Sequence, residues 1–212
     1  MANNDNACGL YLLTPEHIDN VQAFALTLDA VLATGAVDCV QLRLKDVADD
    51  VIIATAETLL QVCHAHEVPL FINDRTDIAV LVDADGVHLG QDDGDVATAR
   101  ALLGAAKDIG VTCHGSKDMA FTAGDQGANY VAFGAFFPSP TKPGAALADT
   151  ELLTVWDEIT DIPCVAIGGI TPQNCGELKA AGAHFVAVCA AIWDDRDGPV
   201  AAAKKFGEAL EK

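Results

Sequence analysis

Short apolar runs alternate along the whole chain with longer stretches in which apolar positions recur every three or four residues. Valine-rich runs of about four to eight residues, bounded by polar residues or glycine, predict buried β-strands, and the longer periodic stretches predict amphipathic helices. The predicted strands are GLYLL (9–13), VDCVQLRL (37–44), PLFIN (69–73), DGVHLG (85–90), DIGVTC (108–113), NYVAFGAF (129–136), PCVAIGG (163–169) and HFVAVCA (184–190). The predicted helices cover residues 17–33, 49–66, 75–82, 95–106, 117–126, 149–160, 172–181 and 198–211.

Eight strand–helix units in a chain of 212 residues predict an α/β protein, a single (β/α)8 TIM barrel that spans residues 1–212. The alternative is a doubly wound sheet, which normally has fewer units and favours a glycine-rich dinucleotide-binding loop that the sequence does not contain. Thr14-Pro15 and Thr171-Pro172 are suitable N-terminal caps for the first and seventh helices. Active sites of such barrels lie at the C-terminal ends of the strands, so the polar residues there are the candidates for chemistry.

The composition agrees with this fold and limits the partners. Apolar residues make up 51% of the chain and aromatic residues only 6%, a balance that suits a closely packed parallel sheet. The 31 acidic residues outnumber the 12 basic ones, which gives a formal net charge of -19 at pH 7. Such a negative surface repels nucleic acid and anionic lipid, so neither is expected as a partner. Each cation is therefore informative, because an anionic ligand needs local positive charge.

The seven cysteines form no CxxC pair, which argues against both a disulfide framework and a zinc site. Cys39, Cys164 and Cys189 lie inside apolar strand-like runs, where cysteine usually acts as a small buried hydrophobe. No signal peptide is recognised and no apolar run is long enough to span a bilayer, so a cytoplasmic protein without a membrane partner is expected. The oligomeric state is left open, with a homo-oligomer as one option.

Cations and amides end the second and third predicted strands. Alternation along a strand places Gln41, Arg43 and Lys45 on one face, at the barrel interior or its mouth. Two cations on one face suit a polyanion better than a single carboxylate, although a structural salt bridge is the alternative. Asn73 and Asp74 end the third strand, where Asp74 could also serve as a helix cap.

Carboxylates at neighbouring strand ends predict a metal site. Asp93 follows the fourth strand, next to Asp92, and lies near Asp74 of the third strand end. Two carboxylates, with water or phosphate oxygens that complete the shell, are what Mg²⁺ accepts. A solvated helix start is the alternative for Asp92-Asp93, but the nearby Arg43 and Lys45 favour a metal–diphosphate site.

The fifth strand ends in Thr112, Cys113 and His114. By alternation Thr112 and His114 share a face, and both are placed to hydrogen-bond a ligand. Cys113 points to the opposite face, so it is not expected to pair with His114 as a nucleophile.

The sixth and seventh strand ends predict phosphate binding. AFFPSPTKPG (135–144) passes from apolar strand into a loop in which prolines frame Ser139, Thr141 and Lys142. We interpret this loop as a grip on an anionic group, with an ordinary surface connection as the alternative. Gly168-Gly169 precedes a predicted helix start, where backbone N–H groups and the helix dipole favour a phosphate.

Together these segments resemble one known family. QLRLK, FINDR, DGVHLGQDD, GVTCH, AFFPSPTKPG and VAIGGIT are similar, in order and in strand position, to segments of thiamine-phosphate synthases, and the similarity covers essentially the whole chain. The resemblance implies a (β/α)8 barrel that joins hydroxymethylpyrimidine diphosphate to thiazole phosphate and releases diphosphate with Mg²⁺ as cofactor. Small phosphorylated molecules are then its substrates.

The resemblance also implies roles for individual residues. The implied substrate-binding residues are Gln41, Arg43, Lys45, Asn73 and Thr112 on the diphosphate side, and Ser139, Thr141, Lys142, Gly169 and Ala190 toward the loop and the thiazole phosphate. His114, which strand alternation places on the face of Thr112, is a further candidate for substrate binding. Asp74 and Asp93 match the Mg²⁺ carboxylates. Arg43, Lys45 and Lys142 are the implied catalytic residues, which neutralise the charge that develops on the departing diphosphate.

Three positions depart from the family pattern. Thr112 stands where the family usually has serine and Ser139 where it usually has threonine, so both keep a hydroxyl. Ala190 stands where members commonly carry serine, which removes one hydrogen bond to a charged group, worth about 1.5–3 kcal/mol. Two alternatives follow: a thiazole tautomerase that uses His114, and a barrel that binds a phosphorylated ligand without turnover.

Overall fold

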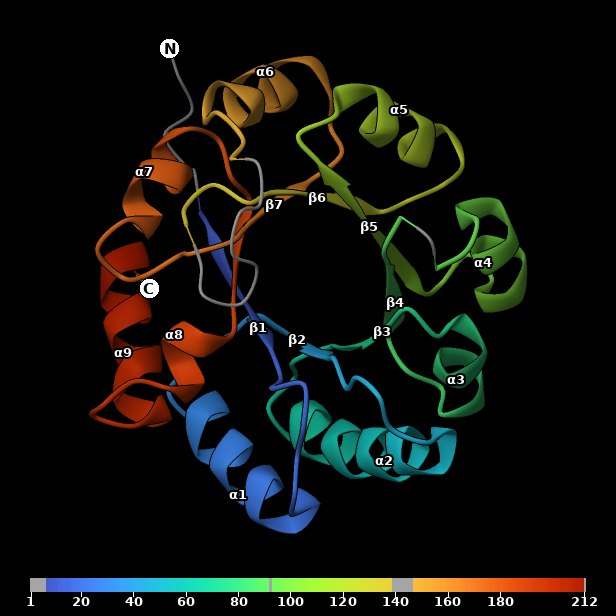
Figure 1. Cartoon of the computed structure of the whole chain (residues 1–212), viewed down its shortest axis with the longest axis vertical. Helices are drawn as coiled ribbons and strands as arrows, with labels where there is room; N and C mark the ends of the chain where they lie inside the picture. Colours follow the sequence, from blue (N-terminus) through green and yellow to red (C-terminus); the bar gives the residue numbers. More distant parts are fainter. Residues whose placement is uncertain (1–6, 92, 139–146, 212) are drawn as a thin grey trace.

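Eight parallel strands close into a barrel in the computed structural model, which describes residues 7–91, 93–138 and 147–211 (Figure 1). Each strand pairs with its neighbour in sequence, and β1 closes the barrel against β8. The strands are β1 (Gly9–Leu13), β2 (Cys39–Leu42), β3 (Leu70–Asn73), β4 (Gly86–Leu89), β5 (Asp108–His114), β6 (Tyr130–Gly134), β7 (Cys164–Ile167) and β8 (Phe185–Val188). The predicted TIM barrel is confirmed.

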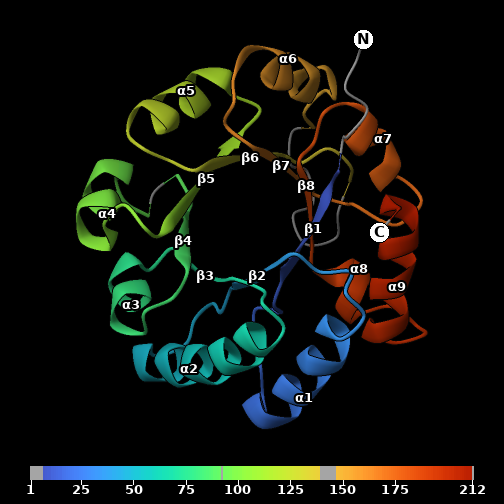
Figure 2. The same ribbon diagram turned by 180° about the vertical axis from the view of Figure 1, so that it is seen from behind.

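Helices surround the barrel on all sides, as the view from behind also shows (Figure 2). They are α1 (Val21–Leu32), α2 (Asp49–Ala65), α3 (Thr76–Leu81), α4 (Val96–Leu103), α5 (Lys117–Asp125), α6 (Glu151–Ile159), α7 (Cys175–Ala180), α8 (Ala190–Trp193) and α9 (Pro199–Leu210). All eight predicted helices have a counterpart. The short α8 was not predicted, because its residues were assigned in part to the preceding strand.

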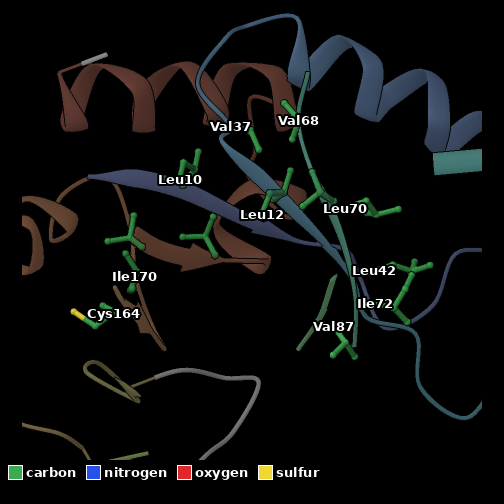
Figure 3. Close-up of a cluster of buried hydrophobic side chains, with 14 of the residues drawn as sticks. Leu10, Leu12, Val37, Leu42, Val68, Leu70, Ile72, Val87, Cys164 and Ile170 are labelled. Carbon is green, nitrogen blue, oxygen red and sulfur yellow. The ribbon is translucent and has the colours of Figure 1, made fainter. Parts of the chain in front are cut away.

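Strand alternation divides the apolar side chains into two clusters. Leu10 and Leu12 of β1, with Leu70 and Ile72 of β3, belong to the larger cluster, in which the outer face of the barrel packs against the helices (Figure 3). Each fully buried leucine contributes about 1.5–3 kcal/mol through the hydrophobic effect. The smaller cluster fills the barrel interior with strand residues: Tyr11, Leu13, Cys39, Phe71, Tyr130, Ala132, Val165 and Ala187.

The second strand is shorter than predicted, which is a correction to the sequence-based boundary of 37–44. β2 ends at Leu42, and the backbone N–H of Arg43 donates to the side-chain hydroxyl of Thr14 at 2.9 Å. The N–H of Lys45 then donates to the carbonyl of Glu16 at 3.1 Å. The loop after β1 thus takes over the hydrogen bonds that a continued strand would make, so Arg43 and Lys45 lie beyond the strand.

Two predicted helix caps are wrong. α1 is capped by Asn20, whose side-chain oxygen accepts from the N–H of Ala23 at 3.0 Å, rather than by Thr14-Pro15. α7 begins after Asn174 rather than at Thr171-Pro172. Here the side chain of Asn174 folds back, accepts from the N–H of Thr171 at 2.8 Å and donates to the carbonyl of Gly169 at 3.1 Å. Local side-chain hydrogen bonds therefore delay both helix starts.

All seven cysteines are free thiols, and each except the half-buried Cys189 is buried. This confirms that Cys39 and Cys164 act as core residues rather than as disulfide partners. Within the described ranges, no helix combines the length and apolar character needed to cross a membrane.

Candidate functional site

The C-terminal ends of β2 and β3 bring two amides together. Gln41 is only 3% exposed, and its Nε2 donates to Oδ1 of Asn73 at 2.7 Å. This bond uses one donor of Gln41 and one acceptor of Asn73, so the Gln41 carbonyl oxygen and the Asn73 amide nitrogen keep their hydrogen-bonding capacity. The structure therefore places these two predicted ligands side by side at one edge of the barrel mouth.

Lys45, Asp74 and Asp93 form a charged cluster beside these amides. The Lys45 ammonium lies 2.6 Å from Oδ2 of Asp74. Burial raises the pKa of the Asp93 carboxyl, and its hydrogen bond with Asp74 and the negative charge of Asp74 raise it further. Gly90 makes room for this contact, because a Cβ at Gly90 would lie 2.3 Å from Oδ2 of Asp93 and 3.8 Å from Oδ1 of Asp74. The predicted pair of carboxylates is thus brought together.

Neither carboxylate is a helix cap. α3 is preceded by Arg75, which makes no side-chain capping bond, and α4 is capped by Asp95, whose carboxylate accepts from the N–H of Thr98 at 3.1 Å. The helix-cap alternative for Asp74 and the helix-start alternative for Asp93 therefore lose their support. Asp92 lies outside the described residues.

The donor set at Asp74 and Asp93 fits a hard divalent cation. Mg²⁺ is usually bound by one or two carboxylates, while waters and substrate phosphates supply the other ligands. Two carboxylates that share a hydrogen bond repel each other once both are ionised, and a cation between them relieves that repulsion. In the part of the chain that the structure describes, no group of three or more His, Cys, Asp or Glu side chains could hold a metal by itself. A metal here would need ligands from outside the protein.

Arg43 is held by a residue that the sequence analysis did not select. Its Nη1 donates to Oε1 of Glu16 at 2.5 Å, and this guanidinium lowers the pKa of the Glu16 carboxyl. The sequence feature that could have identified Glu16 is an acidic residue three positions after the end of β1, the strand that neighbours β2. Both cations of the β2 end are thus paired with carboxylates, as the salt-bridge alternative expected. Such half-exposed pairs contribute only about 0–1 kcal/mol, so an anionic ligand can displace them.

His88 is a second functional candidate that the sequence analysis missed. It points into the barrel, where it is 8% exposed, and its Nε2 lies 2.8 Å from Oγ1 of Thr112. Its Nδ1 lies 3.0 Å from the hydroxyl of Tyr130. Burial lowers the pKa of His88 to about 4, so the imidazole is neutral at pH 7. The sequence feature that could have identified His88 is its position in the strand DGVHLG, two residues after Gly86, where alternation places it in the barrel interior.

The prediction that Thr112 and His114 share a face is wrong. Thr112 pairs with Ala132 of β6, but a β-bulge follows, and His114 pairs with Phe133, which belongs to the outward row. His114 is exposed and has a φ of 52°. The bulge inserts one residue into β5 and so reverses the alternation on which the prediction rested.

Cys113 is not a nucleophile, as predicted. Its side chain is buried, its thiol donates to the carbonyl of Val111 at 3.6 Å, and burial raises its pKa to about 12. At neutral pH it therefore stays a protonated thiol, which is a poor nucleophile.

The segment after β6 reaches the end of β7. The N–H of Phe137 donates to the carbonyl of Gly168 at 3.0 Å. Gly169 has a φ of 66°, and a Cβ there would lie 2.6 Å from the carbonyl oxygens of Phe137 and Pro138. Gly169 is thus required for both its backbone conformation and this close approach. Ser139, Thr141 and Lys142, which continue this segment, lie outside the described residues.

Ala190 begins α8, directly after β8. In (β/α)8 barrels the loops after the seventh and eighth strands, together with a short extra helix, commonly form a phosphate site. The preceding Cys189 donates its thiol to the carbonyl of Thr14 at 3.4 Å, and burial raises its pKa to about 11. Trp193 of the same helix donates to the carbonyl of Leu13 at 2.7 Å. α8 is therefore tied to the end of β1.

Known proteins match this chain over nearly its full length. A family model described as thiamine monophosphate synthase matches residues 10–192. The thiamine-phosphate synthase of Rhodospirillum centenum is 49% identical over 203 residues, which cover 96% of this chain and 98% of that relative. The chain belongs to the thiamine monophosphate synthase family.

Two further comparisons agree with this assignment. The thiamine-phosphate synthase of Erythrobacter litoralis is 45% identical, with 99% of each chain covered. Among solved structures, thiamine phosphate pyrophosphorylase from Pyrococcus furiosus superposes with a TM-score of 0.85 at 29% identity and covers 97% of this chain and 96% of that one. The family resemblance inferred from six sequence segments is therefore confirmed.

The segments that match the family lie next to one another around the barrel mouth. The segments that resemble the thiamine monophosphate synthase family come from the ends of β2 through β7, which are consecutive around the barrel. The amide pair, the Lys45–Asp74–Asp93 cluster and Thr112 all lie at the ends of β2 to β5, whereas Gly169 lies at the end of β7. The ends of β2 to β5 thus carry cations and carboxylates, whereas the end of β7 carries a glycine with an accessible backbone.

Proposed function

We propose that this protein is a transferase that joins 4-amino-2-methyl-5-hydroxymethylpyrimidine diphosphate to thiazole phosphate and yields thiamine phosphate and diphosphate. The observation that carries the proposal is the Lys45–Asp74–Asp93 cluster at the mouth of a barrel of the thiamine monophosphate synthase family. Carboxylates beside a cation suit a metal-bound diphosphate.

In the proposed reaction the bond between the pyrimidine methylene carbon and the diphosphate oxygen breaks first, and diphosphate takes the electron pair. Arg43 and Lys45 exchange their carboxylate partners, Glu16 and Asp74, for oxygens of the leaving group. Gln41 and Asn73 present the remaining amide donor and acceptor groups beside it. The lone pair of the thiazole nitrogen then forms the new bond to the pyrimidinylmethyl cation, so no side-chain nucleophile is needed.

Asp74 and Asp93 would hold Mg²⁺. When bound there, the ion neutralises charge on the leaving diphosphate. With Asp74 among the residues that would hold the ion, a phosphate oxygen would be the alternative partner of the Lys45 ammonium. The pairing of Lys45 with Asp74 keeps both groups in place and solvent-accessible, at side-chain exposures of 38% and 18%.

The thiazole phosphate is proposed to lie on the opposite side of the mouth. Gly169 and the N-terminal residue of α8, Ala190, would contribute backbone N–H groups there. Support comes from Gly169, whose backbone approaches Phe137 and Pro138 so closely that a Cβ would lie 2.6 Å from both carbonyl oxygens. Ala190 has no hydroxyl to add, so backbone groups would carry more of this phosphate's binding.

The alternatives have less support. A tautomerase that uses His114 would require this imidazole to face the substrate, whereas His114 follows a bulge and pairs in the outward row. Such an enzyme would also have no use for Asp74 and Asp93. A barrel without turnover would rest on Ala190 alone, against 49% identity to a named synthase. Cytoplasmic location, the absence of a nucleic-acid partner and the oligomeric state stay predictions.

The test combines purified protein with both substrates and Mg²⁺. We expect thiamine phosphate and diphosphate to appear in equal amounts, with no product when Mg²⁺ is chelated. Binding of both substrates without product would favour the non-catalytic barrel. Isomerisation of a thiazole substrate in the absence of pyrimidine diphosphate would favour the tautomerase.

A further inference from the structure

A continuous chain of polar side chains runs through the barrel interior beneath the mouth. The hydroxyl of Tyr11 lies 2.8 Å from the hydroxyl of Tyr130, which lies 3.0 Å from Nδ1 of His88. Nε2 of His88 lies 2.8 Å from the hydroxyl of Thr112. Tyr11, Tyr130 and His88 are at most 8% exposed, and Thr112, at the upper end of the chain, is half-buried. The chain therefore leads from the sealed interior to the proposed diphosphate side.

A glycine allows this chain to form. Gly110 of β5 pairs with His88 of β4 on one side and with Tyr130 of β6 on the other. A Cβ at Gly110 would lie 1.9 Å from Cζ of Tyr130 and 2.3 Å from its hydroxyl oxygen. The tyrosine ring thus lies across β5 in the space that a side chain would occupy, and two residues from strands that are not adjacent meet there.

The number of protons in the chain is fixed. Burial keeps the pKa of Tyr11 and of Tyr130 well above the usual tyrosine value, so both hydroxyls stay protonated. The His88 side chain is 8% exposed and its ring nitrogens lie against the hydroxyls of Tyr130 and Thr112, an environment that favours the neutral imidazole with one ring proton. The three hydrogen bonds can therefore run in one of two directions: from Tyr11 toward Thr112, or from Thr112 toward Tyr11.

Only one direction satisfies every buried donor. If the bonds run from Tyr11 upward, Tyr11 donates to Tyr130, Tyr130 to Nδ1 of His88, and Nε2–H of His88 to Thr112. If they run downward, the Tyr11 proton is left over, and within the described residues the Tyr11 hydroxyl has no partner besides Tyr130. A buried hydroxyl proton without an acceptor is destabilising, so the upward direction is favoured.

We propose that Tyr11, Tyr130 and His88 are positioning residues that hold the Nε2–H tautomer of His88 and thereby turn the Thr112 hydroxyl proton toward the diphosphate. This inference rests on the proposed function, because the contact between Thr112 and diphosphate is part of it. Thr112 accepts from His88, so its own proton has to point elsewhere, and the barrel mouth is where an anionic acceptor would lie.

The tautomer can be observed directly, without ligand or activity. Long-range ¹H–¹⁵N spectra of protein labelled with ¹⁵N-histidine distinguish Nε2–H from Nδ1–H, and His88→Gln identifies the signals of His88 among the six histidines. We expect the Nε2–H form in the unmodified protein. In Tyr130→Phe the donor to Nδ1 is lost, and the second tautomer should become populated. An Nδ1–H form in the unmodified protein would overturn the proposal.

Binding of inorganic diphosphate with Mg²⁺, measured by calorimetry, tests the consequence for the ligand. Thr112→Val should weaken binding about ten-fold or more, because a hydrogen bond to a charged group is lost, and Thr112→Ser should restore it. Tyr130→Phe should weaken binding by an amount between about two-fold and the full effect of Thr112→Val. In a Thr112→Val background it should have no further effect.

Thr55→Val is the matched control, because it removes a buried hydroxyl that has no hydrogen-bond partner, on α2. We expect it to bind diphosphate like the unmodified protein. If Tyr130→Phe binds as Thr55→Val does, or weakens binding equally with and without Thr112, His88 and the tyrosines have no positioning role. If the unmodified protein has the Nε2–H tautomer but binds no diphosphate, it is the proposed function that fails.

Discussion

The ammonium of Lys45 lies 2.6 Å from a carboxylate oxygen of Asp74, and that carboxylate also shares a hydrogen bond with Asp93. Asp74 therefore stands between a partner that attracts it and a neighbour that repels it. A metal ion would attract Asp74 and a diphosphate would attract Lys45, so either ligand would weaken the ion pair between these two residues. Under the proposed function, the metal would take Asp74 and the diphosphate would take Lys45, so the two parts of one complex would replace this ion pair.

Asp93→Asn should separate activity from stability. A carboxyl whose pKa is raised by burial and by Asp74 is less stable when ionised, so at neutral pH it opposes folding, and the neutral amide should leave the thermal midpoint unchanged or higher. We expect Mg²⁺-dependent turnover to fall by more than about 100-fold, because several kcal/mol of charge stabilisation are lost.

Asp95→Ala is the opposite control. Its carboxylate caps α4, so its loss should lower the thermal midpoint and leave turnover intact at temperatures where the protein is folded. Thermal unfolding and a product assay on both variants test this pair. Full activity in Asp93→Asn would remove Asp93 from the metal site.

Glu16→Gln should strengthen diphosphate binding. The Glu16 carboxylate pairs with Arg43 at 2.5 Å, and a ligand has to displace it. Because an exposed ion pair contributes about 0–1 kcal/mol, its removal should tighten binding by at most about five-fold. Glu211→Gln, which removes the ion pair with Lys179 beyond α9, is the control. Weaker binding in Glu16→Gln, measured by calorimetry, would mean that Glu16 orients Arg43 rather than competes for it.

Gly90→Ala should displace the Asp93 carboxylate. The added Cβ would lie 2.3 Å from Oδ2 of Asp93, the end of a side chain that can move, so the fold should survive while the Mg²⁺ concentration for half-maximal activity rises about ten-fold or more. Gly176→Ala is the matched control, since nothing lies within 4 Å of its Cβ. Equal Mg²⁺ requirements in the two variants would contradict the prediction.

Arg75→Gln should remove part of the acid sensitivity of folding. Arg75 donates to Asp49 at 2.7 Å and to Asp77 at 2.7 Å, which joins the start of α2 to the start of α3, and it lowers the pKa of both carboxyls. A lowered carboxyl pKa stabilises the fold above the unfolded value of about 3.9, and this stabilisation is lost as the pH falls through the folded values.

Urea unfolding at pH 7 and near pH 2 measures this effect. We expect Arg75→Gln to be less stable than the unmodified protein at pH 7, and the difference to shrink at the lower pH. A difference that is the same at both values would show that Arg75 acts through packing of its side chain instead of through charge.

The barrel could be predicted because its evidence is local. Runs such as GLYLL and PLFIN indicate buried strands, and the eight-fold repetition of strand and helix indicates a closed parallel barrel. The ends of the elements were harder to predict, because side chains from neighbouring segments determine them. β2 ends early since the Thr14 hydroxyl accepts from the Arg43 N–H, and no periodicity in 37–44 reveals that bond.

Candidate site residues could be predicted where they directly follow the end of a strand. They were missed where their position depends on the register between neighbouring strands. Asp74 and Asp93 come together because β3 and β4 are neighbours. The role proposed for His88 depends on Gly110, which lies opposite it only through the pairing of β4 with β5. His114 was assigned to the wrong face, because a single inserted residue in β5 carries no signature in the sequence.

The ring centroids of Tyr11, Phe71 and Tyr130 lie 5.8–5.9 Å from one another in the barrel interior. These three rings fill the barrel interior between its two ends. The contacts His64–Asp85 and Lys107–Asp83 involve residues that lie ahead of β3, β4 and β5, at the opposite end of the barrel from the candidate site. Affinity tags, surface anchors or fused domains are therefore best attached at that end, where they would leave the chemistry undisturbed.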